Sequence, residues 1–454
     1  MSTINSQVSS EHIKELCSQI LKYNHIDSED FNRFNVKRGL RNSDGTGVMA
    51  GISRICSVEG YYISDGERIP KDGRLTFRGI SMEDIVKGCS DENRFGYEEI
   101  VWLLLFGSLP TKEQLDNFCE LLSSCRELPD NFAEDMIMKA PSPDIMNKLA
   151  RSVLALYSYD DNPDDTSLEN VLRQCINIIA EIPVIMAYAY QVKRRHYYKK
   201  SMYIHPIKPE HRTAQAVLGA VRADKSFTDE EAKLLDTCLM VHAEHGGGNN
   251  STFATRVLTS SGTDTYSAIA AGIGALKGPK HGGANIKVSQ MVEFIRNDVA
   301  NINDEGQIAD YLRKIIKKEG GDRSGLIYGM GHAVYTISDP RARILKERAG
   351  KFAAGTEFEE EFNLLQSIES LTPAIFAEFK GERKNICANV DLYSGLVYKM
   401  LRIPPDLFTP IFTIARVAGW SAHRIEELLT GGRIIRPAYK NINPAGIYVP
   451  ITER

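Results

Sequence analysis

The spacing of apolar residues along this chain predicts a protein built almost entirely from helices. From Thr228 to about Glu244, apolar residues recur every three or four positions, which is the spacing of one buried helix face. Thr228 is followed three positions later by a glutamate, a capping-box pattern that opens a helix. The glycines at 246–248 are predicted to end it, which places His242 and His245 at the end of a buried helix.

Residues 40–80 break this pattern. They combine spaced glycines, Asp-Gly turns and β-branched or aromatic residues, which predict one or two small hairpins. Strands do not alternate with helices after this region, so a parallel α/β sheet is not expected. The predicted fold class is mainly α with small N-terminal β hairpins. Two helices are predicted to begin at residues 81 and 111. Further helices are predicted near residues 10–24, 97–106, 131–139, 144–158, 167–190, 265–277 and 407–429, and residues 286–318 are predicted to form two more.

Length and composition refine this picture. A chain of 454 residues, of which 43% are hydrophobic, is too long for one compact core, so at least two domains are expected. The net charge of −4 is small for this length and argues against nucleic acid as the main partner. The eight cysteines form no Cys-x-x-Cys pair and are interpreted as thiols in a reducing compartment.

No targeting or membrane segment is evident in the sequence. The N-terminus lacks the basic-then-apolar order of a signal peptide. No uninterrupted apolar run approaches the roughly 20 residues that span a bilayer, so a cytoplasmic location is predicted and no membrane partner is expected. Residues 191–208 are the most basic segment. A solvated surface or a phosphate-contacting rim is favoured there over nucleic-acid binding, because the run is short.

Two histidines lie at opposite kinds of helix end. His281 follows a break at Gly278-Pro279 and opens a helix, where the macrodipole disfavours positive charge and keeps the imidazole neutral. His245 lies near a helix C-terminus, where the same field favours the imidazolium form. Either histidine alone fits a capping or core role. Together, between glycines that let a ligand approach the backbone, they indicate a site.

Arginines in unusual positions indicate an anionic ligand. Arg341 lies in the first turn of a predicted helix, where its charge is unfavourable unless an anion is close; a solvent-facing arginine is the alternative. Arg416 interrupts an apolar stretch with no acidic residue three or four positions away. Its counter-ion is therefore distant in sequence or a ligand. Arg436 follows in a loop, and arginines suit bidentate contact with carboxylates.

Asp391 and His332 complete the candidates. Asp391 begins a predicted helix, where the dipole keeps a carboxylate ionised and basic, although an N-cap aspartate has the same pattern. His332 follows a glycine-rich stretch that lacks the full dinucleotide fingerprint, and neither a Walker A nor a nucleophile-elbow motif is present. A carboxylate base and a neutral histidine donor enolise a carbon beside a carbonyl. The predicted reaction class is carbon–carbon bond formation through an enol.

Five motifs, in order, resemble those of the citrate synthase family from about residue 40 to the end. They are HAEHGGGN at 242–249, GPKHGGAN at 278–285, GMGHAVYTISDPRA at 329–342, NVDLYSG at 389–395, and ARVAGWSAH at 415–423 with RIIRP at 433–437.

This resemblance implies a helical homodimer in which each subunit has two domains that close over substrate. Residues 1–282 and 401–454 are expected to form the large domain and residues 283–400 the small one. The implied reaction condenses acetyl-CoA with oxaloacetate and water to give citrate and CoA, through an enol and citryl-CoA. Oxaloacetate is expected to bind first. No tightly bound cofactor and no metal are implied, and coenzyme A thioester is a substrate.

The resemblance also implies roles for the matched side chains. Asp391 is expected to take the methyl proton of acetyl-CoA, while His281 donates to the enolising thioester oxygen. His332 is expected to polarise and protonate the oxaloacetate carbonyl, assisted by His245.

Substrate-binding roles follow from the same motifs. The residues expected to bind oxaloacetate carboxylates are Arg341, Arg416 and, across the dimer interface, Arg436. The residues expected to contact CoA are Leu326, Ile327, Tyr328 and Gly329, through their backbone, with Lys384 a candidate for its phosphates.

Some positions depart from the family, and alternatives remain open. Lys280 stands where the family commonly has leucine, and the first 40 residues match no family segment, so a simple dimer without NADH regulation is expected. A 2-methylcitrate synthase using propionyl-CoA is the nearest alternative, because one methylene changes a barrier by only about 1–3 kcal/mol. A citryl-CoA lyase, a metal-dependent hydrolase and a non-catalytic regulator that binds CoA or a dicarboxylate are the others.

Overall fold

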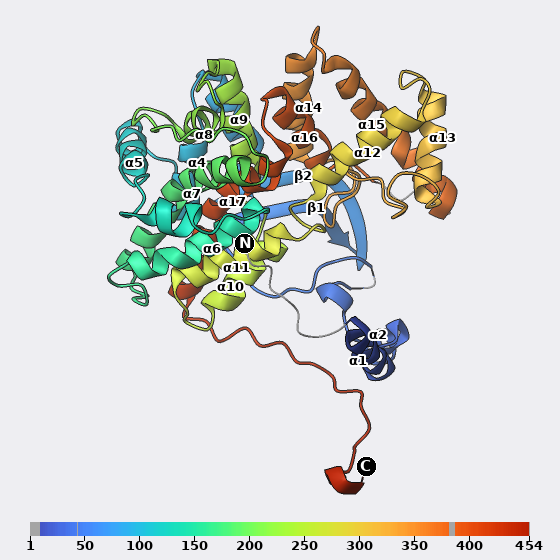
Figure 1. Cartoon of the computed structure of the whole chain (residues 1–454). Coiled ribbons are helices and arrows are strands. Elements are labelled where there is room, and N and C mark those ends of the chain that lie inside the picture. The colour runs from blue at the N-terminus through green and yellow to red at the C-terminus, as the bar shows by residue number, and fades with distance from the viewer. Residues whose placement is uncertain (1–9, 43, 381–385, 454) are drawn as a thin grey trace. The chain divides into compact units, whose positions relative to one another are not determined.

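The computed structural model describes residues 10–42, 44–380 and 386–453 (Figure 1). Its contacts define two compact units, residues 1–50 with 436–454, and residues 51–435. The predicted large and small domains, divided at residues 282 and 400, stay a prediction. The elements of the first unit are α1 (Ser10–Tyr23), α2 (Ser28–Arg33), η1 (Arg38–Leu40) and η5 (Ile451–Glu453).

The second unit is mainly helical, as the sequence predicts. Its helices are α3 (Met82–Asp91), α4 (Tyr97–Phe106), α5 (Lys112–Ser124), α6 (Ile145–Leu156), α7 (Leu168–His196), α8 (Thr213–Val221), α9 (Asp229–His242), α10 (Asn250–Thr259), α11 (Thr265–Lys277), α12 (Ala284–Asp298), α13 (Glu305–Ile316), α14 (Pro340–Ala353), α15 (Glu359–Lys380), α16 (Asp391–Met400) and α17 (Phe408–Thr430). Shorter segments are η2 (Ala133–Met138), η3 (Tyr157–Tyr159) and η4 (Pro405–Leu407).

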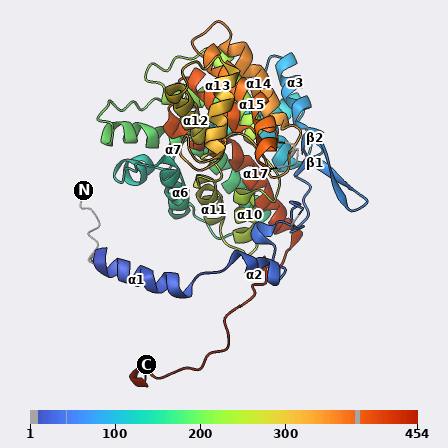
Figure 2. The same ribbon diagram turned by 90° about the vertical axis from the view of Figure 1, so that its right-hand side faces the viewer.

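Helix α17 lies at the centre of the second unit. It packs against α4, α6, α7, α9, α10 and α11, and Figure 2 shows its ribbon between α10, α11 and the strands. Every side chain from Phe408 to Ile425 is buried. A helix that is buried on all sides needs an apolar surface all round, which this stretch supplies except at a few polar positions. One of these is Arg416, which α17 carries into the interior.

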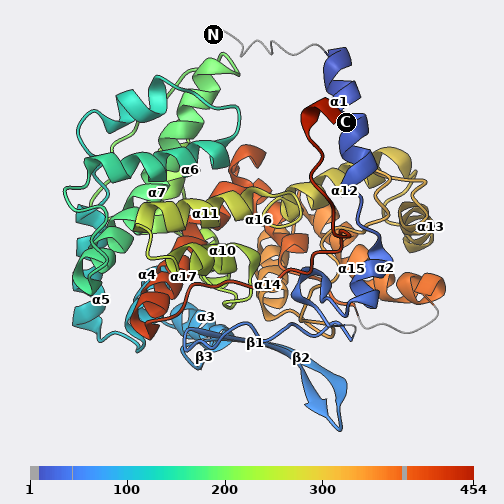
Figure 3. The ribbon, with the colours of Figure 1, turned by 90° about the horizontal axis from the view of Figure 1, so that it is seen from below.

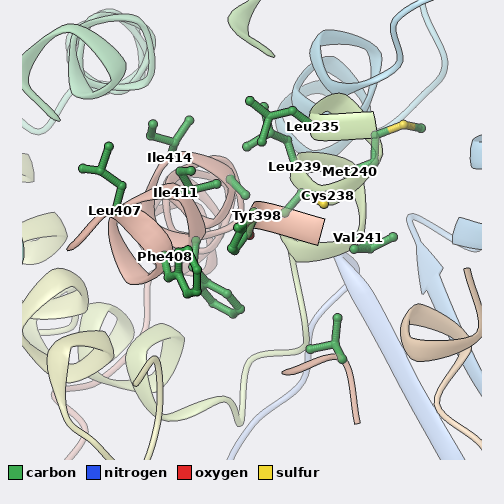
Figure 4. Close-up of a cluster of buried hydrophobic side chains, with 14 of the residues drawn as sticks. Leu235, Cys238, Leu239, Met240, Val241, Tyr398, Leu407, Phe408, Ile411 and Ile414 are labelled. Atoms are coloured by element: carbon green, nitrogen blue, oxygen red, sulfur yellow. The ribbon is translucent and has the colours of Figure 1, made fainter. Parts of the chain in front are cut away.

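A cluster of apolar side chains joins α9, α16 and α17 (Figure 4). Leu235 of α9, Tyr398 of α16 and Ile411 of α17 are each fully buried. Burying an aliphatic side chain of this size contributes about 1.5–3 kcal/mol. The cluster holds α9 and α16 together, and these helices lead into His245 and begin at Asp391, respectively.

A small antiparallel sheet, in the order β1-β2-β3, confirms the predicted hairpin region. Strands β1 (Cys56–Ser64) and β2 (Glu67–Phe77) form a hairpin whose turn end extends away from the helices (Figure 3), and β3 (Ile80–Ser81) is short. The β1–β2 register is interrupted between Glu59 and Tyr61. An interruption of this kind is a bulge, which bends and re-aims a strand.

Most predicted helix starts are confirmed, and some details differ. Capping boxes are present at Thr111 and Thr228, whereas Ser81 makes no capping hydrogen bond from its side chain. Helix α9 ends at His242, earlier than predicted, because the Glu244 carboxylate accepts the Gly246 amide hydrogen bond and turns the chain. Helices α2, α8, α10 and α15 were not predicted. The buried face of α10 is polar, so no apolar periodicity marks it; it consists of Ser251, Thr252, Thr255 and Thr259.

Within the described residues, one helix, α7, is long and apolar enough to cross a membrane. Of its most apolar window, 89% is buried inside the protein. Burial of that extent is typical of a core helix in a folded domain.

Candidate active site

His281 lies in the turn between α11 and α12. A Cβ on the next residue, Gly282, would lie 2.5 Å from the Leu276 carbonyl oxygen, so the turn requires glycine there. The Nε2 atom of His281 lies 3.0 Å from Ser251 Oγ, and Trp420 Nε1 donates to the same oxygen at 3.2 Å. The serine therefore fixes the position of the imidazole ring.

The predicted neutral state of His281 is confirmed, although its main cause differs from the predicted one. Burial, followed by the Arg416 charge, lowers the pKa of His281 to about 4. The helix N-terminus acts in the same direction. At neutral pH the ring is an uncharged imidazole with one N–H to donate.

His332 stacks on Tyr335 in the loop before α14, with 4.6 Å between ring centroids. Its Nδ1 accepts hydrogen bonds from the amides of Val334 at 3.0 Å and Tyr335 at 3.1 Å. An accepting Nδ1 places the proton of a neutral imidazole on Nε2. The loop therefore selects the tautomer in which Nε2 is the donor.

His245 lies beside this pair, its ring perpendicular to that of His332 with 5.1 Å between centroids. The predicted imidazolium at His245 is wrong. Burial, and then the charge of Arg341, lower the pKa of His245 well below its ordinary value. The residue is only 7% exposed, and desolvation of this degree outweighs the field at the C-terminus of α9.

Arg341 is buried and already has an anion beside it. Its Nε and a terminal nitrogen donate to the two carboxylate oxygens of Asp339 at 3.1 and 2.8 Å. Asp339 also caps α14 by accepting the Arg341 amide hydrogen bond at 3.0 Å. The anion that the sequence requires at this helix start is therefore supplied, at least in part, by the protein.

Arg416 is fully buried, and its Nε donates to the His242 carbonyl at 2.7 Å. Within the described part of the chain, its two terminal nitrogens have no hydrogen-bond partner. The guanidinium lies 4.7 Å from the centroid of the Phe412 ring. Burial lowers the pKa of Arg416 to about 10, with Glu244 opposing the shift, so the group stays charged at neutral pH. An arginine held this way is suited to a ligand carboxylate.

A bridge between residues 329–331 and 387–389 holds Asp391 close to the His332 loop. The Asn389 amide donates to the Gly329 carbonyl at 2.9 Å. The Asn389 side chain donates to the Gly331 carbonyl at 2.9 Å and accepts the Asp391 amide hydrogen bond at 3.0 Å. Asn389 thus connects Asp391 to the loop that carries His332.

The acidity of Asp391 is set mainly by burial. Burial raises the pKa of Asp391 to about 6, against the opposing charges of Arg341 and Arg416. Part of the side chain remains accessible, but the surrounding protein still desolvates the carboxylate. The helix dipole was expected to keep the carboxylate ionised, and at a pKa of about 6 it is still mostly ionised at pH 7, although burial opposes the dipole. The result is a base poised near neutral pH.

Glu244 and His423 form a buried network that the sequence did not reveal. Arg256 donates to His423 Nδ1 at 2.7 Å, and because arginine cannot accept, Nε2 carries the imidazole proton. This Nε2 lies 3.0 Å from Glu244 Oε1, which also accepts the Gly246 amide hydrogen bond at 2.5 Å. Glu244 is thus an ion distant in sequence that offsets the charge of Arg416.

The remaining predicted residues are placed less fully. Ile327 is buried and Leu326 is 56% exposed. A Cβ on Gly329 would lie 2.8 Å from the Leu392 side chain, and its φ of 80° also requires glycine. Lys384 lies outside the described residues. Arg436 belongs to the first compact unit, where it is exposed.

Electrostatic interactions join the second unit's candidates into one site. His245 interacts with Arg341, His332, Arg416 and His281, and Asp391 interacts with both arginines. Four contributors were missed from sequence: Ser251, Tyr335, Phe412 and Glu244. Phe412 stands one helical turn before Arg416, a spacing that places both on one face. No group of three or more His, Cys, Asp or Glu side chains among the described residues is arranged to hold a metal ion.

Comparison with known proteins gives the family. Residues 43–438 match the family model described as citrate synthase, C-terminal domain. The chain belongs to the citrate synthase family. Among its relatives, a citrate synthase of Synechocystis is 33% identical over 436 residues, covering 96% of each chain. The 2-methylcitrate synthase 1 of Corynebacterium glutamicum is 32% identical, covering 90% of this chain and 98% of that protein.

Solved structures of the citrate synthase family share the fold. Citrate synthase from Thermoplasma acidophilum, in a ternary complex with carboxymethyl coenzyme A and oxaloacetate, has a TM-score of 0.73 and 28% identity. It covers 89% of this chain, which covers 97% of it. Citrate synthase from Thermotoga maritima has a TM-score of 0.70 and 29% identity, with 90% and 98% coverage. The predicted family and the mainly helical fold class are confirmed.

Proposed function

We propose that this protein condenses acetyl-CoA with oxaloacetate and water to give citrate and CoA. The observation that carries this proposal is one site holding a carboxylate with a pKa of about 6, a neutral imidazole and two buried arginines. Family membership supports the same reaction, as does the relative that was solved with a CoA analogue and oxaloacetate.

The first step forms the enol of acetyl-CoA. The Asp391 carboxylate removes a methyl proton while the His281 N–H donates to the thioester oxygen, where negative charge develops. For Nδ1 to be the donor, Nε2 must accept from the Ser251 hydroxyl, 3.0 Å away. That hydroxyl has one proton and also lies 2.9 Å from Asn249 Oδ1, so it must turn from Asn249 to His281 when the enol forms. The neutral form of the His281 ring suits this step. Its N–H is about as weak an acid as the enol, so it stabilises the enol by a hydrogen bond and keeps its own proton.

The second step joins the enol to the ketone of oxaloacetate. The enol carbon attacks the carbonyl carbon, and His332, whose Nε2 carries the proton, donates to the oxygen that becomes the citrate hydroxyl. Arg416 and Arg341 bind the oxaloacetate carboxylates, with His245 assisting at the carbonyl. Water then cleaves the thioester of citryl-CoA, which releases CoA and gives the third carboxylate of citrate.

CoA is a substrate in this proposal. The backbone of residues 326–329 is proposed to contact its adenine, and Lys384 its phosphates. The homodimer, with Arg436 contributed across the interface, the two closing domains and a cytoplasmic location also belong to the proposal. These rest on the likeness to the family, and oxaloacetate is proposed to bind before acetyl-CoA.

Acetyl-CoA is expected to be preferred over propionyl-CoA by kcat/KM with oxaloacetate. One added methylene alters the barrier by about 1–3 kcal/mol, so a preference of about 10- to 200-fold is expected. The 2-methylcitrate reaction is the second candidate, because relatives of that name are as similar as the citrate synthases. Steady-state release of CoA thiol from both thioesters measures the ratio. A higher kcat/KM for propionyl-CoA would replace citrate with 2-methylcitrate as the product.

The pH dependence of kcat/KM for acetyl-CoA is expected to follow Asp391. A base must be deprotonated, so the rate should rise about tenfold per pH unit below 6 and level off above it. The pKa of about 6 fixes this midpoint. The pKa of His281, about 4, keeps its ring neutral throughout that range. A rate that is flat from pH 5 to 7 would contradict the assignment of Asp391 as the base.

A further inference from the structure

The β1–β2 hairpin contacts both loops of the proposed oxaloacetate site, although it contributes none of the proposed catalytic groups. Its bulge, at the register break after Glu59, lies against residues 334–340, the loop between His332 and Arg341. Earlier on β1, Val58 lies against the loop that follows His245. The sequence predicts this hairpin as a break in a mainly helical chain, and the proposed reaction steps use none of its residues.

Two glycines of the hairpin make the closest contacts with the His332 loop. A Cβ on Gly73 would lie 2.0 Å from the Ser338 carbonyl oxygen and 2.8 Å from the Tyr335 ring. A Cβ on Gly60 would lie 2.6 Å from the Val334 carbonyl oxygen. Real Cβ atoms do not approach this closely, so both positions admit no side chain without movement of the loop. Tyr335, which lies against Gly73, stacks on His332, so Tyr335 connects the hairpin to the proposed catalytic ring.

Hydrogen bonds reinforce the same contact. The Gly73 amide donates to Ser338 Oγ at 3.1 Å, and the Ser338 hydroxyl donates to Asp72 Oδ1 at 3.0 Å. The Arg68 guanidinium donates to the Val334 carbonyl at 3.2 Å and lies 4.1 Å from the Tyr61 ring centroid. These bonds hold a loop that has no helix or strand of its own at this point.

The base of the hairpin touches the second loop. Gly246 has a φ of 84°, and a Cβ there would lie 3.1 Å from the Val58 side chain. Cys56, two residues earlier on the strand, lies among the ionised groups of the site: burial raises the pKa of its thiol, as does Glu244, while Arg416 and Arg341 oppose the shift. One rigid element thus borders the His245 loop at its base and the His332 loop at its bulge.

We propose that the β1–β2 hairpin is a positioning element that sets the distance between the His245 loop and the His332–Arg341 loop, and thereby the affinity for oxaloacetate. Gly73 of the hairpin and Ser338 of the loop it contacts are the principal positioning residues. This inference rests on the proposed function, because it concerns the same substrate. The physical basis is that displacing binding groups by about 1 Å costs up to about 10²-fold in rate or affinity.

The test compares two disruptive variants with two matched controls. Gly73→Ala is expected to raise KM for oxaloacetate at least about tenfold, and Ser338→Ala about threefold, with kcat changed less than KM in each. Asp72→Asn keeps the Oδ1 acceptor for Ser338, and Gly51→Ala adds a Cβ with no atom within 4 Å. Both controls are expected to stay within about twofold of the wild type.

Hydrogen exchange of the peptide spanning residues 332–340 gives a second readout that does not depend on turnover. Exchange there should be at least about threefold faster in Gly73→Ala and Ser338→Ala than in the controls, while the Tm of Ser338→Ala stays near that of the wild type. Unchanged KM and unchanged exchange in Ser338→Ala would overturn the inference, even if Gly73→Ala does not fold. A proportional loss of kcat and Tm without a KM change would also overturn it. A wild-type protein that forms no citrate would refute the proposed function, and the exchange data would still test the hairpin.

Discussion

Replacing Asp391 by asparagine is expected to lower kcat for citrate formation by about 10²- to 10⁴-fold, the contribution of a positioned general base. The amide has nearly the same shape but cannot accept the methyl proton of acetyl-CoA. KM for oxaloacetate should change by less than about threefold, because the arginines proposed to bind it are untouched. Steady-state thiol release at pH 8 measures both constants.

Asp391→Glu is the matched control, since it keeps a carboxylate but moves it by one methylene. It is expected to retain a pH-dependent rate that Asp391→Asn lacks. A kcat for Asp391→Asn within tenfold of the wild type would remove Asp391 from the role of base.

Asp391→Asn is also expected to make the folded protein more stable at neutral pH. The folded pKa of Asp391, about 6, lies above the ordinary value of 3.8, so between these two pH values the folded state holds a proton that the unfolded state has released, and above about pH 6 the folded state carries a buried charge. The stability associated with this group is present below pH 3.8 and is lost as pH rises through about 6. The two-unit shift corresponds to at most about 3 kcal/mol at pH 7. Denaturant unfolding of Asp391→Asn at pH 7 and pH 5 should show a gain that shrinks at the lower pH.

Replacing His281 by alanine is expected to lower kcat by about 10²- to 10³-fold, the usual loss when one donor to a developing oxyanion is removed. His281→Asn is the matched control, because the nitrogen of its side-chain amide can donate a hydrogen bond from the place of Nδ1. It is expected to recover about tenfold of the lost rate. Ser251→Ala, which removes the group beside Nε2, should fall between the wild type and His281→Ala.

Kinetic comparison of these variants separates donor loss from disruption of the fold. KM for oxaloacetate should remain within about threefold of the wild type in all of them. If His281→Ala kept a wild-type kcat, or if His281→Asn were as slow as His281→Ala while Ser251→Ala had no effect, the Nδ1 donor would not be part of the mechanism.

Local sequence signals were sufficient for most helices. The capping boxes at Thr111 and Thr228 and the boundaries of α11 follow from interactions among residues three or four positions apart, which a sequence displays directly. Helix α10 was missed because its buried side chains are serine and threonines, so the apolar periodicity on which the prediction depends does not mark its buried face. The end of α9 was placed two residues late because the Glu244 side chain, just beyond the helix, accepts the Gly246 amide hydrogen bond.

Protonation states were the weakest sequence predictions. His245 was expected to be imidazolium, and Asp391 to be kept ionised by the dipole with no opposing effect, because a helix dipole is visible in sequence and burial is not. In the fold, desolvation lowers the pKa of His245 and raises that of Asp391. At these positions, desolvation by residues far apart in the chain shifts the pKa more than the helix dipole does. The neutral state of His281 was predicted correctly because dipole and burial act in the same direction there.

By itself, the sequence determined the family and the helical fold class and named the residues of the proposed site, because motifs and periodicity are local properties of the chain. The tertiary structure decided what surrounds each group. It placed Glu244 beside Arg416 and the hairpin's glycines against the loop of His332, across 170 residues or more of sequence. It also selected the tautomer of His332 through backbone amides. Distances and desolvation between remote segments exist only after folding, and these set the acidity and orientation of the proposed site.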